Sequence, residues 1–147
     1  MKETSAGAII FRKNKENKFL LLEYKYKNKF WDFPKGNVEK NEEEKETVKR
    51  EIEEETGIKT IIFIPEFRER ISYIYKREGK TVFKEVIFYL IETKEKKIKL
   101  SEEHIGYKWL KYEDALKTLT YPAAKNILKK ADEFLKTKKQ KQLFDFK

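Results

Sequence analysis

The chain contains no cysteine among its 147 residues. Disulfides, thiol catalysis and thiolate metal sites are therefore excluded. It also has only one histidine, three prolines and five glycines, and it shows neither an internal repeat nor a domain linker. We expect a single domain over residues 1–147, which is long enough to bury a core of ordinary size.

Long apolar runs are absent as well. None approaches the ~18–20 residues of a transmembrane helix, and residues 1–7 lack the apolar region of a signal peptide. We therefore expect a soluble cytoplasmic protein without a membrane partner. Neither pattern nor composition distinguishes a monomer from a homodimer.

Acidic residues are too few to balance the basic ones, and the formal net charge is +9. Such an excess favours anionic partners, and either a polyphosphate substrate or RNA would satisfy it. The alternative is that the lysines only keep the surface soluble. The most concentrated basic segment is 136–141, within a tail that we expect at 136–147.

Apolar periodicity predicts a chain of mixed strands and helices. A polar loop is expected at 33–36, before the first helix. The expected strands are at 6–11, 19–24, 60–64, 70–75, 81–91 and 107–110, and the expected helices are at 42–56, 114–119 and 123–135.

The helix expected at 42–56 has signals at both ends. Asn41 is a good N-cap, and Glu44 follows it three residues later as a capping-box partner. Gly57 comes directly after the helix and suits the left-handed position that ends many helices.

Three glutamates of this helix form an acidic group without a basic residue among them. Glu51, Glu54 and Glu55 lie at i, i+3 and i+4, so they are neighbours on a helix surface. Like charges in this arrangement cost roughly 0.2–0.5 kcal/mol per pair. Carboxylate oxygens suit Mg²⁺ or Mn²⁺, so the group indicates a metal site. A solvated acidic face without function is the alternative.

Glycine, glutamate, arginine and aliphatic residues recur at fixed spacing between positions 36 and 58. The residues concerned are Gly36, Glu42, Arg50, Glu51, Ile52, Glu54, Glu55, Gly57 and Ile58. This spacing matches the Nudix box at every defined position, and the chain resembles the Nudix hydrolases. The resemblance implies cleavage of nucleoside diphosphates linked to another moiety. It also implies an α/β (α+β) fold in which a mixed β-sheet is sandwiched between α-helices.

The same resemblance implies roles for individual residues of the box. Glu54 and Glu55 correspond to metal-binding carboxylates, and Glu51 to a metal ligand or general base. Arg50 corresponds to the arginine that orients the glutamates. The backbone carbonyl of Lys35 corresponds to a further metal ligand. Glu42 lies more than two turns earlier, and we expect a structural or supporting role for it.

Segments 31–36, 100–104 and 107–110 are similar to those of asymmetric diadenosine tetraphosphate hydrolases. This similarity implies that Glu103 is a further metal ligand and that Lys84 contacts phosphate. It also implies that Tyr73 and Tyr121 stack on adenine. One departure is Asn37, which stands where some members carry histidine.

Several aromatic residues also have a plain structural interpretation. Tyr73 and Tyr121 are candidates for packing as well as for base stacking. Trp31 and Trp109 are expected to be packing residues. His104 is expected to orient Glu103 or to cap a turn, and not to act as a catalytic group.

The resemblance implies the hydrolysis of diadenosine tetraphosphate to ATP and AMP, and we expect Mg²⁺ or Mn²⁺ as the metal. Water attacks phosphorus, and Lys35 or Lys84 stabilises the leaving phosphate. Three alternatives remain open from the sequence: an RNA 5′-triphosphate pyrophosphohydrolase, a house-cleaning nucleoside triphosphate pyrophosphatase, and a non-catalytic module that binds a nucleotide.

Overall fold

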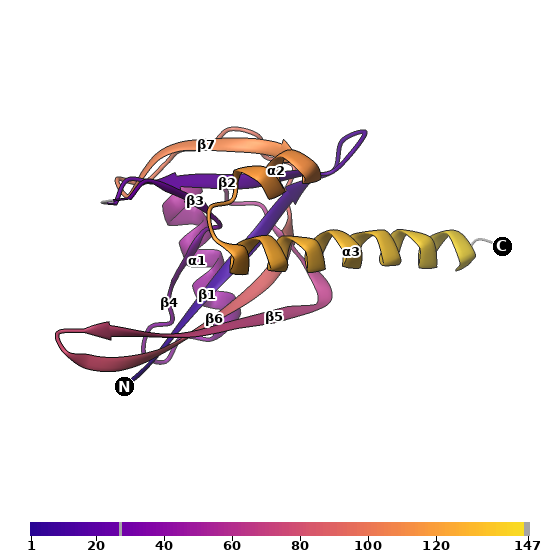
Figure 1. The fold of residues 1–147 in the computed structure, drawn as a ribbon. Helices are drawn as coiled ribbons and strands as arrows, with labels where there is room; N and C mark the ends of the chain where they lie inside the picture. Colours follow the sequence, from indigo (N-terminus) through magenta and orange to yellow (C-terminus); the bar gives the residue numbers. More distant parts are fainter. Residues whose placement is uncertain (27, 146–147) are drawn as a thin grey trace.

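The computed structural model describes residues 1–26 and 28–145. Within these residues the chain forms seven strands and three α-helices (Figure 1). In chain order they are β1 (Lys2–Arg12), β2 (Lys18–Tyr24), β3 (Phe30–Asp32), β4 (Lys35–Asn37), α1 (Glu44–Thr56), β5 (Ile62–Arg77), β6 (Lys80–Glu92), β7 (His104–Lys111), α2 (Tyr112–Thr118) and α3 (Pro122–Asp145).

The described strands form one mixed sheet in the order β3-β2-β1-β6-β5. β1 and β6 run parallel, with pairs from Lys2↔Phe83 to Phe11↔Glu92, and the other pairs are antiparallel. β4 pairs with β1, and β7 pairs with β2. The first strand of the chain therefore lies at the centre of the sheet.

Helices cover both faces of the sheet, so β1 is buried on both sides. Ile9 and Phe11 pack on one face with Leu128 of α3. Ile10 packs on the opposite face with Val48 of α1. Alternate residues of a strand point to opposite faces, which explains why β1 is apolar throughout its buried part. This arrangement confirms the expected mixed sheet between helices.

The predicted N-terminal cap of α1 is wrong, whereas the C-terminal one is confirmed. Asn41 has φ of 66°, a left-handed conformation that does not lead into a helix as a cap. The helix begins at Glu44, and the capping box is formed by Glu43 and Glu46. Gly57 has φ of 76° and ends the helix as expected.

The two strands predicted at 60–64 and 70–75 are a single strand, β5. Its pairing with β6 shifts register between Phe63 and Arg68. Glu66 lies within this irregularity with φ of 72°. Residues 65–69, which separate the two expected strands, are therefore part of β5.

The basic segment 136–141, expected as a tail after the helix, is part of α3. This helix continues past the rest of the domain (Figure 1), and its last buried residue in the core is Ala131. Residues 146–147 lie outside the described part of the chain. Within that part, no helix is both long and apolar enough to cross a membrane.

Candidate active site

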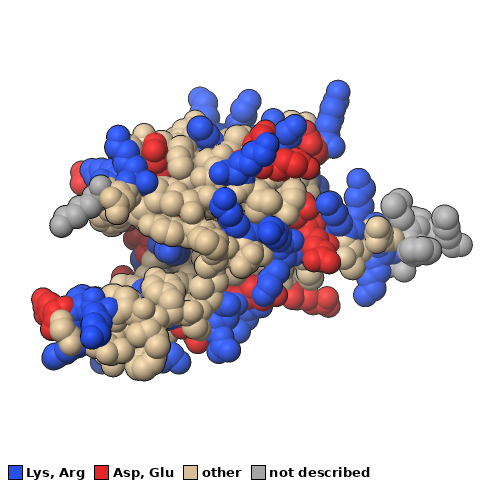
Figure 2. All heavy atoms as spheres, viewed as in Figure 1, with Lys and Arg blue, Asp and Glu red and all other residues tan. Residues whose placement is uncertain are grey.

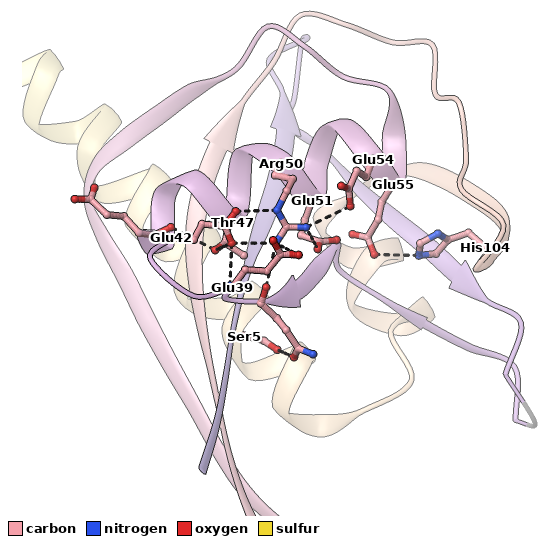
Figure 3. A network of polar contacts seen from close by, with 11 residues as sticks. Ser5, Glu39, Glu42, Thr47, Arg50, Glu51, Glu54, Glu55 and His104 are labelled. Atoms are coloured by element: carbon pink, nitrogen blue, oxygen red, sulfur yellow. Dashed lines mark hydrogen bonds and ion pairs between the residues drawn. The ribbon is translucent and has the colours of Figure 1, made fainter. Parts of the chain in front are cut away.

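Arg50 of α1 links the glutamates of the box through its whole guanidinium group (Figure 3). Its Nε and Nη2 donate to the two carboxylate oxygens of Glu42 at 2.8 and 3.0 Å. Nη1 donates to Glu51 at 2.7 Å and to Glu54 at 3.4 Å. Nη2 also donates to the backbone carbonyl of Asn37 at 3.1 Å. These bonds hold the pKa of Glu42 near 2, so Glu42 anchors the arginine as an anion.

Gly36 allows Glu51 to approach the sheet closely. The residue lies in β4, where part of a loop was expected at 33–36, and it pairs with Ala6 of β1. A Cβ atom at position 36 would lie only 2.0 Å from Cδ of Glu51. The glycine is therefore required for the observed position of this carboxylate.

Glu55 is a buried carboxylate with an incomplete set of partners. Glu55 is 3% exposed, and its Oε2 has no hydrogen-bond partner. One potential ligand atom each from Glu55, Glu103 and His104 lie within 4.8 Å of one another. Burial, together with the charges of Glu51 and Glu103, raises the pKa of Glu55 to about 9, although the backbone amide and ammonium group of Lys35 oppose this.

This arrangement fits a divalent cation. A buried carboxylate oxygen without a partner is costly, and a hard cation prefers oxygen ligands of this kind. The fold brings together the predicted ligands Glu55 and Glu103, with Glu51 within electrostatic reach of both. Glu54 lies at the rim, where its side chain is 58% exposed and contacts Arg50.

His104 faces Glu55, although the sequence suggested an orienting contact with Glu103 or a turn cap. Its Nε2 lies 3.7 Å from Oε1 of Glu55 (Figure 3). Its Nδ1 lies 2.9 Å from Oγ of Ser101, and its ring packs edge-on against Tyr24. Burial lowers the pKa of His104 to about 4, so the imidazole is neutral near pH 7.

A cavity of about 550 Å³ separates the β5–β6 hairpin from β3 and the start of α3. Figure 2 shows this hollow at the left of the molecule. Lys35, Tyr73 and Tyr121 line it, so three of the predicted substrate-binding residues meet there. Phe30 and Phe88 also line the cavity. Sequence reasoning missed these two: Phe88 falls in an expected strand, where an apolar residue normally indicates core packing, and the strand that holds Phe30 was not expected.

Lys35 connects the cavity with the acidic group. Its ammonium lies 3.1 Å from Asp32 at the cavity wall, while its backbone amide interacts with Glu55. Burial alone would lower the pKa of Lys35, but the Asp32 carboxylate more than offsets this and raises it. The ammonium is therefore charged next to both parts of the site.

Lys84 lies beside the cavity and not in its lining. It is paired with Tyr73 across the hairpin and borders an adjoining hollow of about 490 Å³. Its Nζ donates to Oδ1 of Asn37 at 2.9 Å and lies 3.4 Å from Glu3. Ser5 also donates to this Asn37 oxygen. Burial lowers the pKa of Lys84, and Glu3 opposes the effect.

A family model described as a NUDIX domain matches residues 1–131. The chain belongs to the NUDIX family. Hydrolases of this family use divalent metal ions, in agreement with the acidic group around Glu55. The mixed sheet and its three helices are the NUDIX fold.

Named relatives of this NUDIX protein match it over most of their length. The asymmetrical bis(5′-nucleosyl)-tetraphosphatase of Rattus norvegicus is 34% identical over 142 residues, covering 89% of this chain and 94% of the relative. The enzyme of the same name from Mus musculus is 35% identical with the same coverage. The crystal structure of a C. elegans Ap4A hydrolase binary complex superposes with a TM-score of 0.77 at 30% identity, covering 92% of this chain and 98% of the other.

Proposed function

We propose that this NUDIX protein, as a single domain, hydrolyses diadenosine tetraphosphate to ATP and AMP with Mg²⁺ or Mn²⁺. The observation that carries the proposal is the buried, incompletely paired Glu55 carboxylate beside Glu103. Lys35 joins this acidic group to a cavity lined by Tyr73 and Tyr121. The names of the relatives described above support the same substrate.

The metal would be held by carboxylates from two parts of the chain. Glu55 and Glu103 would supply carboxylate oxygens, and Glu51, Glu54 and the backbone carbonyl of Lys35 would be the further ligands. The bound metal neutralises phosphate charge and lowers the pKa of a water molecule. Arg50 prevents Glu51 and Glu54 from turning away, because its guanidinium donates to both.

The rest of the substrate would occupy the cavity and its rim. Tyr73 and Tyr121, each 45% exposed, offer ring surface to one adenine, and stacking of this kind contributes about 1–3 kcal/mol per base. Lys35 and Lys84 supply positive charge to the polyphosphate. Water then forms a new bond to phosphorus as a bridging P–O bond breaks, and ATP and AMP separate.

RNA with a 5′-triphosphate is a second candidate substrate. The observation in its favour is the group of lysines on the projecting part of α3, where Lys139 and Lys141 are exposed. A polyanion longer than a dinucleotide could contact these residues while its end occupies the acidic site.

A substrate panel in ¹⁸O-labelled water tests the proposal. Diadenosine tetraphosphate, triphosphorylated RNA and a set of nucleoside triphosphates are compared with Mg²⁺ and with Mn²⁺. We expect the dinucleotide to be the best substrate, with the label in only one of the two products, ATP or AMP. The proposal is wrong if the dinucleotide is not cleaved while another member of the panel is.

A further inference from the structure

His104 is buried beside the acidic group, yet the proposed reaction leaves it without a role. The residue is 6% exposed and is the only histidine of the chain. Its Nε2 has no hydrogen-bond partner, and neither has the nearby Oε2 of Glu55. Two buried polar groups at one place without partners call for an explanation.

The hydrogen bonds of Ser101 identify which nitrogen of the neutral His104 ring carries the proton. The backbone N–H of Glu103 donates to Oγ of Ser101 at 3.4 Å. The hydroxyl proton is then free to point at Nδ1 of His104, 2.9 Å away. A neutral imidazole carries one proton, so a ring that accepts at Nδ1 carries it on Nε2.

The ring is also held in place by its neighbours. Tyr24 packs against it with ring centroids 4.3 Å apart. The hydroxyl of Tyr24 donates to the backbone carbonyl of Phe33 at 2.9 Å. The backbone N–H of His104 donates to the carbonyl of Ser101. These contacts direct Nε2 at Glu55 and leave the ring little freedom to turn.

We propose that His104 is a positioning residue, which Ser101 orients so that its Nε2–H donates to the Glu55 carboxylate in the metal-bound protein. The inference rests on the proposed role of Glu55 as a metal ligand. A ligating carboxylate is deprotonated, so it accepts a hydrogen bond from Nε2–H. The present 3.7 Å separation shortens to hydrogen-bond length when the site is loaded.

Direct coordination of the metal by His104 is the competing role, because its Nε2 lies among the potential ligand atoms. Coordination would require an unprotonated Nε2. Mg²⁺ prefers oxygen ligands, and Glu55 and Glu103 already provide them. A donor that fixes one ligand is therefore the better use of this nitrogen, as in other metal sites where outer hydrogen bonds orient the ligands.

Nitrogen NMR distinguishes the two roles directly, since the chain has one histidine. The protein is labelled with ¹⁵N-histidine and loaded with Mg²⁺, and the protonation of each ring nitrogen is measured. We expect a proton on Nε2 and none on Nδ1. An unprotonated Nε2 in the Mg²⁺-loaded protein overturns the inference.

Variants then test whether the contact positions Glu55. We expect His104→Leu to weaken Mg²⁺ binding, measured by calorimetry, by about 10–100-fold, and Ser101→Ala to weaken it less. His104→Gln retains an N–H donor and should restore part of the affinity. Thr93→Val is a matched control, because it removes a buried hydroxyl that bonds elsewhere, to the carbonyl of Thr60.

Kinetics at saturating Mg²⁺ complete the test. His104→Leu should lower kcat more than it changes KM for the dinucleotide, because the substrate cavity is intact. Normal Mg²⁺ affinity in a folded His104→Leu variant overturns the inference even if Nε2 is protonated. If the wild-type protein binds Mg²⁺ but cleaves no dinucleotide, the proposed function fails while the NMR and calorimetry still decide the role of His104.

Discussion

The proposed activity needs the Glu55 carboxylate, but its burial lowers the stability of the metal-free protein. This carboxyl is buried close to Glu51 and Glu103, and these surroundings raise its pKa from 4.5 to about 9. In the metal-free protein the folded state therefore keeps a proton that the unfolded state releases. The free energy of unfolding falls as pH rises from about 4.5 to about 9, because only the unfolded chain loses this proton.

We predict that Glu55→Gln abolishes turnover but stabilises the metal-free protein. Turnover should fall by orders of magnitude, because a ligand is lost. In EDTA at pH 8, the free energy of unfolding should rise by about 1–3 kcal/mol, with a smaller gain at pH 5. Chemical denaturation at both pH values measures this. Glu53→Gln is the control, because it makes the same substitution on the exposed side of α1; near-normal turnover of Glu55→Gln would contradict the prediction.

Much of the acidic group was predictable, but the assignment of partners within it was not. The spacing of Glu51, Glu54 and Glu55 placed them together on α1, as the structure confirms. It did not reveal that Arg50 holds two of them while the third turns toward His104. That division depends on a segment almost fifty residues later in the chain, and local spacing carries no information about such distant contacts.

At the scale of elements, the backbone conformation at each boundary explains which of the predicted ends of helices and strands are confirmed. Gly57 was identified because few residues other than glycine adopt a positive φ at a helix end. Asn41 misled because asparagine suits both an N-cap and a left-handed position, and here it takes the latter. The two strands expected at 60–64 and 70–75 are one strand, because a register shift between Phe63 and Arg68 carries β5 through the residues between them.

We predict that Gly57→Ala destabilises the fold more than Gly79→Ala. Both glycines have φ of 76°, and an alanine in this conformation costs about 1–2 kcal/mol. Only at position 57 would the new Cβ also crowd a neighbour, Cβ of Lys99 at 3.1 Å, whereas position 79 is open. Urea denaturation of both variants measures the difference, and an equal loss would show that Lys99 yields without cost.

On the scale of the whole molecule, the net charge of +9 is not concentrated at the proposed site. Lysines and arginines are scattered over the face in Figure 2 and continue along α3. Charges separated by more than about 8 Å are largely screened at physiological salt. The projecting part of α3 therefore contributes little to the field that a small substrate meets in the cavity.

We predict that Lys139→Gln combined with Lys141→Gln changes kcat/KM for diadenosine tetraphosphate by less than about twofold at physiological salt. Binding of triphosphorylated RNA should weaken clearly if RNA uses this helix, with a shallower dependence on salt. Steady-state kinetics and a salt titration of RNA binding measure the two effects. A tenfold loss with the dinucleotide would show that the helix acts at the site.

The central position of β1 has a consequence for synthesis of the protein on the ribosome. β1 emerges before the strands with which it pairs, but its parallel partner β6 ends only at Glu92. Until that residue leaves the exit tunnel, one edge of the nascent β1 has no neighbour from its own chain. Pairing of β1 with β6 must therefore wait until β6 has been made, and until then the apolar β1 exposes an unpaired strand edge that a chaperone could protect.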